Sequence, residues 1–315
     1  MEHLMYSLEA TGPVFLLMLC GMLFRKLGLF RDGFVQGANA FVFQIALPVN
    51  LFVQLSAMDV QSVWDPVFVL FCMGVTVVCI FVAALVARLC VPRQVRGEFI
   101  QASYRSSASL LGMAYMENLY GEASAGALMM LGSVSVYNIA AVLVLSLVKP
   151  EGTGTMERGQ VRSLARNVAT NPILLGVVIG FLWGLVKIPM PTLLSKPLEN
   201  IGKTATPLGL LAMGAQVEFG KMRGRLKDAA LASALKLVGF VLLFVPLAIL
   251  LGFRREKLIA IVVMLGSATT VAAYVMARNM GHEGVLTQAA CMITTLLSSF
   301  TLTGWIAALR ALGYV

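Results

Sequence analysis

The sequence predicts an all-α membrane protein in which ten transmembrane helices form two inverted repeats of five helices. Of its 315 residues, 59% are hydrophobic and only 12% are charged, and its mean hydropathy is +0.87. Soluble domains typically carry about 25% charged residues. Apolar segments of about 20 residues, long enough to cross a hydrocarbon core of ~30 Å, recur along the chain. Helix-breaking and charged residues also recur at one sequence offset, which indicates an internal repeat.

The first repeat is expected over residues 1–148. Its first span ends in a basic turn with Arg25 and Lys26, and a short acidic turn follows its second span. The third span is a long apolar segment, the fourth carries a group of polar residues, and the fifth is again apolar. The expected spans are approximately 11–27, 35–57, 66–90, 96–121 and 123–148.

The second repeat is expected over residues 167–315, after a cytoplasmic linker at 149–166 that is rich in glycine and basic residues. Its first span starts at Asn171 and Pro172, and a basic turn separates its second span from its third. The expected spans are approximately 171–186, 198–217, 229–251, 257–280 and 285–312.

The distribution of lysine and arginine predicts the orientation, because cytoplasmic loops carry an excess of positive charge. With both termini on the extracytoplasmic side, the cytoplasmic loops hold about twice as many basic residues as the outer loops. Arg254, Arg255 and Lys257 run against this bias. The net charge of +9 is therefore attributed to cytoplasmic loops and not to nucleic-acid binding.

The internal repeat rests on four residue pairs that share one offset. Each pair is separated by 159 residues: Pro13 and Pro172, Pro48 and Pro207, Asp59 and Glu218, Arg96 and Arg255. An odd number of spans in each half requires the second half to insert upside down. Many secondary transporters have this plan and bind solute at the midplane, where discontinuous helices of the two halves meet. Chance coincidence in a glycine-rich chain is the alternative explanation.

The fourth span carries the first half of the predicted solute site. Arg105 is followed by Ser106, Ser107 and Ser109, and then by Gly112. An arginine at the centre of a membrane helix costs about 2.5–3.5 kcal/mol on insertion scales and usually faces a cavity or a partner. Arg105 could bind a carboxylate through its planar set of donors. Alternatively, it could snorkel to the cytoplasmic face, and the serines could serve only helix contacts.

The ninth span carries the second half of the predicted site, at Ser267, Thr269 and Thr270. Facing helix N-termini at two helix breaks would add positive dipole ends directed at an anion. Asn50, at membrane depth in the second span, either lines the cavity or bridges helices. Pro48 and Pro207 are expected to kink their helices and to shape the scaffold.

Lys236, about eight residues into the eighth span, has three interpretations: it holds a proton, it pairs with Glu218, or it snorkels. The motifs of common enzyme classes are missing. His282 and Glu283 lack the second histidine of a zinc-binding HExxH motif, and the sequence has no P-loop. The five cysteines form no CxxC motif. We therefore expect no enzyme activity, no cofactor and no metal site.

Several segments resemble the auxin efflux carrier family, in its bacterial branch. They are RGEFIQASYRSSASLLGMAYMENLYG, NPILLGVVIGFLWGL, TATPLGLLAMGAQ and NAFVFQIALPVNLF. The resemblance implies the fold of bile-acid symporters and sodium–proton antiporters, with the fourth and ninth helices broken and crossing. Family members often have Arg-Ser-Asn in place of Arg105-Ser106-Ser107, and crossover prolines near Ala114 and Ala268. Without these prolines, the breaks must either depend on Gly112, Gly266 and the Ser and Thr clusters or be shallower.

The resemblance also implies a function. It predicts a secondary active transporter that moves a small organic anion, such as malonate or malate, across a prokaryotic inner membrane by alternating access. A homodimer is expected on the same basis. Two alternatives remain: a symporter of the same fold coupled to a proton or sodium, and a membrane sensor that binds its ligand without transporting it.

Overall fold

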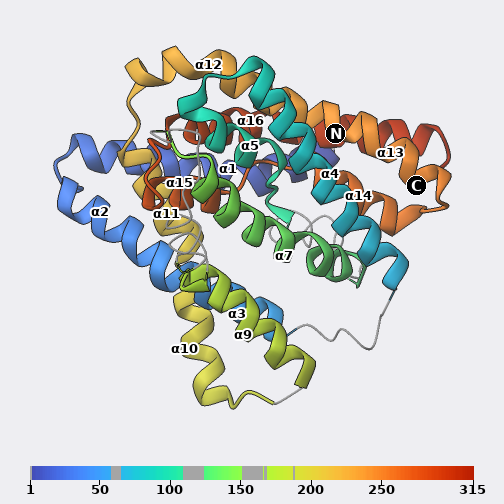
Figure 1. Cartoon of the computed structure of the whole chain (residues 1–315), viewed down its shortest axis with the longest axis horizontal. Helices are drawn as coiled ribbons and strands as arrows, with labels where there is room; N and C mark the ends of the chain where they lie inside the picture. The colour runs from blue at the N-terminus through green and yellow to red at the C-terminus, as the bar shows by residue number, and fades with distance from the viewer. Residues whose placement is uncertain (1, 58–64, 109–123, 151–165, 167–168, 187–188) are drawn as a thin grey trace.

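The computed structural model describes residues 2–57, 65–108, 124–150, 166, 169–186 and 189–315. This part of the chain is helical, and its one isolated β-bridge pairs Ser106 with Thr269. Ser109 and Gly112, two of the predicted site residues, lie outside the described residues. Figure 1 shows α3, α9 and α10 together at one end of the molecule, away from α12, α13 and α16.

Five helical stretches of the described chain are long and apolar enough to cross a membrane. They are Asp32–Ser56, Pro66–Cys90 (α4), Ala125–Leu147 (within α7, Ser124–Leu147), Phe219–Leu250 and Val285–Ala311 (α16). The shorter α9 (Pro172–Val186) is also apolar, and α1 extends over Glu2–Lys26. Most of these helices agree with the spans expected at the same positions, and they support a multi-pass membrane protein. Two start earlier than expected: α1 at Glu2 and the eighth span at Phe219. The basic turn expected before the eighth span was wrong, because its residues lie within the helix that starts at Phe219.

Two spans contain a π-helical turn. The second span consists of α2 (Asp32–Phe41), the π turn η1 (Val42–Ala46) and α3 (Leu47–Ser56). Pro48 lies at the start of α3, just after this π turn. Proline has no backbone N–H, and the wider turn accommodates the hydrogen bond that is therefore missing. The eighth span consists of α12 (Phe219–Ala234), η4 (Leu235–Gly239) and α13 (Phe240–Leu250).

The seventh span is divided into α10 (Thr192–Lys203) and α11 (Ala205–Ala215). Thr204 lies between them, and its hydroxyl donates to the Ile201 carbonyl at 2.6 Å. Pro207 occupies the first turn of α11, where a missing backbone donor breaks no helical hydrogen bond. We expected a kink in one helix here, and the structure has two helices.

Helices also end at the centre of the fourth and ninth spans. Helix α5 (Arg96–Tyr104) stops at Arg105, and α14 (Arg255–Gly266) stops at Ser267. Helix α15 (Val271–Asn279) starts after Thr270. The two interruptions meet, because the Ser107 amide donates to the Ala268 carbonyl at 2.9 Å. The break expected in the ninth span therefore follows Gly266, without a proline.

Glycines allow two pairs of helices to pack closely. Helix α1 crosses α11 where Gly21 contacts the backbone of Leu211 and Gly214 contacts that of Met18. Helix α9 crosses α3 in a similar way, and three glycines four residues apart contact the α3 backbone: Gly176, Gly180 and Gly184. A Cβ atom on Gly184 would lie 2.6 Å from the Leu55 carbonyl oxygen. Small residues of this kind let helix backbones approach one another in membranes.

One ion pair joins the start of α14 to the start of α4. Lys257 donates to Asp65, whose other carboxylate oxygen accepts from the Phe68 amide at 3.0 Å and caps α4. The hydrogen bond from Lys257 is the main cause that lowers the pKa of Asp65 below its ordinary value. The backbone amide of Arg255 also donates to the Tyr314 carbonyl at 3.1 Å. These three segments therefore lie on one side of the molecule.

Candidate functional site

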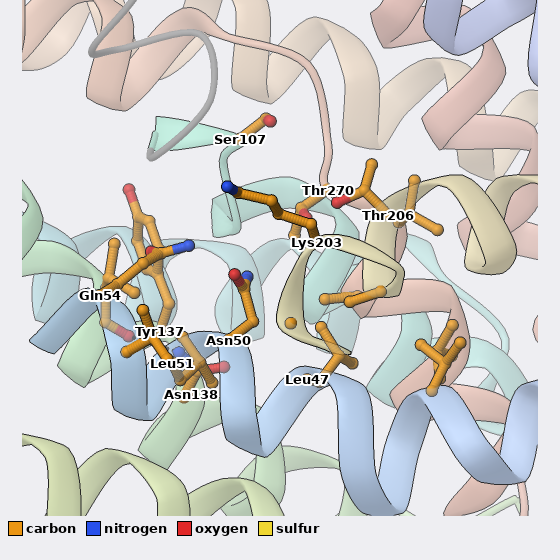
Figure 2. A pocket seen from close by; sticks show the side chains of 18 of the residues that line it. Leu47, Asn50, Leu51, Gln54, Ser107, Tyr137, Asn138, Lys203, Thr206 and Thr270 are labelled. Atoms are coloured by element: carbon orange, nitrogen blue, oxygen red, sulfur yellow. Dashed lines mark hydrogen bonds between the residues drawn. The ribbon is translucent and has the colours of Figure 1, made fainter. Parts of the chain in front are cut away.

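A cavity of about 580 Å³ lies where the two helix breaks meet α3, α7, α10, α11 and α15. Figure 2 shows Asn50 and Gln54 of α3, Tyr137 of α7 and Lys203 of α10 around this space, with Ser107 and Thr270 at the breaks. Its walls also include apolar residues such as Leu47 and Leu51. An apolar cavity with a few converging polar groups is typical of a small-molecule site.

Arg105 lines this cavity and is held by two neighbouring helices. Its guanidinium donates to Asn138 Oδ1 of α7 at 2.6 Å and to Met276 Sδ of α15 at 2.7 Å. Only 4% of the residue is exposed, so the alternative in which Arg105 snorkels to the surface is wrong. Within the described residues, the guanidinium forms no ion pair with a carboxylate. Its remaining donors can therefore serve an anion in the cavity.

Ser106 and Ser107 also line the cavity, but their contacts differ. The Ser106 hydroxyl donates to the Met264 carbonyl at 2.5 Å and accepts from Lys236 Nζ at 2.6 Å. Ser107 is half-buried, and its backbone amide bonds the opposite break. Figure 2 shows the Ser107 side chain at the edge of the space between the breaks.

The second break contributes less to the cavity than we expected. Thr270 lines it, together with the first residues of α15, so the N-terminal end of that helix borders the cavity. Thr269 is buried: its hydroxyl donates to the Ala102 carbonyl at 2.9 Å, and its amide donates to Thr294 Oγ1 at 3.0 Å. Ser267 is fully buried and does not line the cavity.

The other predicted residues also divide into those that line the cavity and those that do not. Asn50 and Pro207 line the cavity, whereas Gly266 packs against Val241 and Leu302, and Pro48 packs against Gly176 of α9. Pro48 and Gly266 thus occupy scaffold positions. Pro207 was expected only to shape the scaffold, but it lies in the cavity wall.

Sequence reasoning left several cavity residues out of the predicted site: Gln54, Tyr137, Asn138, Lys203 and Thr206. Gln54 and Asn138 were noticeable as polar residues within apolar spans. Lys203 was not singled out, and it lies at the end of α10, next to the division of the seventh span that was not predicted. Its side chain is largely exposed and lies 3.5 Å from Glu199, which partly balances its charge.

Two buried charged residues outside the cavity wall also differ from expectation. Lys236 is fully buried and bonds Ser106, so it neither snorkels nor pairs with Glu218, which instead contacts Lys221 at 2.9 Å. Glu98 of α5 was not singled out. Its carboxylate accepts from the backbone amides of Gly284 and Thr287, at 2.9 and 3.1 Å, and so joins α5 to the start of α16.

The site offers a buried guanidinium, amides and hydroxyls, which are groups that bind a small anion. Within the described residues, no cluster of three histidine, cysteine or acidic side chains could hold a metal ion. The breaks leave backbone groups beside the cavity, and irregular backbone at membrane depth is tolerated where it lines a cavity or is buried in protein.

Comparisons with known proteins identify the family of the chain. Residues 6–306 match the family described as membrane transport protein. The chain is 26% identical to a Rhizobium meliloti protein named "Putative malonate transporter", over 96% of this chain and 97% of that protein. It is 24% identical to an "Uncharacterized transporter" of Methanothermobacter thermautotrophicus, over 96% and 98% of the two chains.

These relatives point to a transporter and not to an enzyme. The family match covers every helix that lines the cavity. The chain therefore belongs to the membrane transport protein family, the auxin efflux carrier family that its sequence motifs resemble.

Proposed function

We propose that this protein is a secondary active transporter of a small organic anion, and that Arg105 binds the carboxylate. The single observation that carries the proposal is a buried guanidinium that lines a cavity at the meeting point of two helix breaks. An intramembrane arginine without an acidic partner is costly unless an anion or polar groups compensate it. Asn138 offers one neutral acceptor, and a substrate carboxylate would supply the missing negative charge.

Arginine suits this role because its planar donors match both oxygens of a carboxylate. The N-terminal end of α15, which borders the cavity at Thr270, adds a positive dipole end. Hydroxyl and amide donors from Ser107 and Asn50 can orient the substrate. The cavity volume of about 580 Å³ is ample for a dicarboxylate as small as malonate. The name of the Rhizobium meliloti relative suggests malonate as a first candidate substrate.

The proposed architecture is ten membrane helices in two inverted repeats, residues 1–148 and 167–315, joined by a cytoplasmic linker at 149–166. In two such repeats, the first span corresponds to the sixth and the second to the seventh. The contact of α1 (first span) with α11 (seventh span) then corresponds to the contact of α9 (sixth span) with α3 (second span). The presence of both contacts supports the proposed repeat. The two helix breaks would correspond in the same way.

Alternating access follows from this arrangement. The site lies between helices α3, α10 and α11 on one side and the broken helices on the other, so movement of one group against the other would open the site to either face. We place both termini on the extracytoplasmic side of a prokaryotic inner membrane, as the positive charge of the loops favours.

Counterflow in proteoliposomes tests the proposal. Liposomes loaded with unlabelled malonate should take up labelled malonate only when they contain the protein. Unlabelled malonate and malate should compete, and malonamide, which has the same carbon chain but no charge, should not. The exposed variant Arg223→Gln serves as a control that leaves transport intact. Absence of uptake by the folded protein, or equal competition by malonamide, would contradict the proposal.

A further inference from the structure

A lysine lies directly behind the proposed anion site and has no acidic partner among the described residues. Lys236 is in the π turn η4, and its exposed fraction is 0%. Its Nζ atom donates to Ser106 Oγ at 2.6 Å, and Ser106 itself lines the cavity. Among the described residues, Lys236 forms no ion pair. One hydroxyl therefore separates a buried amine from the space that would hold the substrate.

The hydrogen bonds around Ser106 leave few acceptors for a charged lysine. The hydroxyl proton of Ser106 goes to the Met264 carbonyl, which also accepts from Tyr137 at 3.2 Å. A protonated lysine has three donors, whereas the described residues show one acceptor for them, the Ser106 hydroxyl. A buried charge is expensive unless it is paired and hydrogen-bonded. Whether Lys236 is protonated therefore depends on whether a negative charge lies nearby.

The groups that face Lys236 from the neighbouring helices do not supply that negative charge. Helix α4 presents the thiol of Cys79, α7 presents Tyr137, and the first break presents the positive charge of Arg105. Helix α5 contains Glu98, but backbone amides of α16 hold its carboxylate. Helix α14 is apolar beyond its first turn, α13 has no titratable side chain, and α16 has one charged residue, Arg310, in its last turn.

The acidic residue nearest to Lys236 along its own helix is Asp228, which is separated from it by two turns of α12. Within the part of the chain that the structure describes, the charge that can stabilise a protonated Lys236 must therefore come from the cavity, on the far side of Ser106. A carboxylate bound to Arg105 would lie in that direction, because both residues belong to the same break.

We propose that Lys236 is the proton-binding site of this transporter, and that the anion and one proton move together. This inference rests on the function proposed above. In the loaded state, the lysine amine takes up a proton from water to become an ammonium, and Ser106 accepts one of its hydrogen bonds. When the anion leaves, the ammonium returns the proton to water on the same side. No other bond forms or breaks, and the charge of one carboxylate is balanced.

The test measures anion and proton movement in the same liposomes. The protein is reconstituted with a pH-sensitive dye in the lumen, and labelled malonate is added outside. The wild type is expected to acidify the lumen as malonate enters, and an imposed inward proton gradient should drive malonate accumulation. In Lys236→Met, proton movement and accumulation should be lost, while malonate exchange continues at a reduced rate that no longer depends on pH.

The substitution should not prevent folding, because methionine has a similar length and replaces a buried amine, which forms no ion pair among the described residues, by an apolar side chain. Lys227→Met, an exposed lysine on the same helix, is the matched control and should keep coupled transport. Wild-type malonate transport without proton movement would overturn the inference but not the proposed function. Proton movement retained in Lys236→Met would overturn it too, as would a folded Lys236→Met protein that exchanges no malonate. A wild type that transports no anion would contradict the proposed function itself.

Discussion

The helices that lead into the two breaks end in residues that differ in charge and in access to the cavity. Helix α5 ends at Arg105 and α14 ends at Ser267, each in an extended backbone conformation at the position after the last helical residue. Arg105 lines the cavity, whereas Ser267 is fully buried, and its hydroxyl has no hydrogen-bond partner among the described residues. The two breaks therefore differ in what they present to the cavity.

The contacts around each break support this division. The first break presents Arg105, Ser106 and Ser107 to the cavity. The second break is bonded mainly to protein: Thr269 donates to Ala102 and to Thr294, and the carbonyl of Ala268 accepts from Ser107. We infer that the first break recognises the substrate and that the second fixes the first in place. Substitutions in the two breaks should therefore differ in kind.

The largest expected difference is between the losses of substrate affinity caused by substitutions of Arg105 and of Thr270. Each of these is the residue of its break that is best placed to contact substrate. Arg105→Gln removes a charged partner of the carboxylate, which typically costs about 2–5 kcal/mol, or at least about 30-fold in affinity. Thr270→Val removes a neutral hydrogen bond worth about 0.5–1.5 kcal/mol, or at most about tenfold. Initial rates of malonate uptake at several concentrations measure both effects.

A variant that merely unfolds would mislead this comparison. Each protein should therefore first elute as a single species in detergent and keep the wild-type melting temperature within a few degrees. Equal losses for Arg105→Gln and Thr270→Val would contradict the division of roles between the two breaks.

A smaller effect is expected on stability, and it again distinguishes the breaks. Ser106→Ala leaves Lys236 without its acceptor, and an unsatisfied buried donor costs about 1–3 kcal/mol. Thr269→Val leaves the Ala102 carbonyl without the hydroxyl, at a cost of about 1 kcal/mol. Thermal unfolding followed by circular dichroism should rank Ser106→Ala as less stable than Thr269→Val. The reverse order would contradict the expectation that Ser106 satisfies a buried donor of Lys236.

The first turns of α5 and α14 carry ionic groups that differ in their surroundings. Glu98 on α5 is buried, whereas the pair of Lys257 and Asp65 at α14 is partly exposed. Because the pKa of Asp65 is lowered in the folded protein, its stabilising contribution is present in full above the unfolded value of about 4 and is lost as pH falls through the folded value. An exposed pair of this kind contributes about 0.2–1 kcal/mol.

The melting temperatures of the wild type and Asp65→Asn should therefore differ at pH 7 and converge as the pH falls toward 3. Glu256→Gln, a neighbouring change at a residue that forms no ion pair among the described residues, provides the comparison. A difference that stays constant down to pH 3 would show that the ion pair does not produce the effect of Asp65→Asn.

The smallest effect is expected at Ser267. Its buried hydroxyl has no partner in the described structure, so Ser267→Ala removes no hydrogen bond and relieves the cost of burying a polar group. The melting temperature should stay constant or rise slightly, and malonate uptake should be unaffected. A marked loss of uptake would place Ser267 in the site, and the contrast with Arg105 would then fail.

Much of the fold could be predicted from the sequence because a membrane span is a local pattern. Pro66–Cys90 was predicted with its bounds, and Val285–Ala311 to within one residue, since each is one uninterrupted apolar helix. A break at Gly266 was also expected, from the family resemblance together with the glycine and the Ser and Thr residues that stand where the family's proline is missing. The division of the seventh span at Thr204 was not, since the proline that follows suggested a kink in one helix.

The site was harder to predict because its contacts join distant segments. The Arg105 and Ser106 side chains were identified from their position in an apolar span, but their partners, Asn138 and Lys236, lie 33 and 130 residues away. No local pattern distinguishes a lysine that snorkels from one that bonds a helix break. Glu98 was missed for the same reason, because its partners are backbone amides almost 190 residues away.

The most direct test of the central claim is the affinity of the purified protein for malonate, measured by calorimetry in lipid nanodiscs with the wild type and Arg105→Gln. We expect saturable binding to the wild type, at least about 30-fold weaker binding to a variant with the same melting temperature, and no binding of malonamide to either. Equal affinity of the two proteins for malonate would show that Arg105 does not hold the substrate, and the account of the first break would then be wrong.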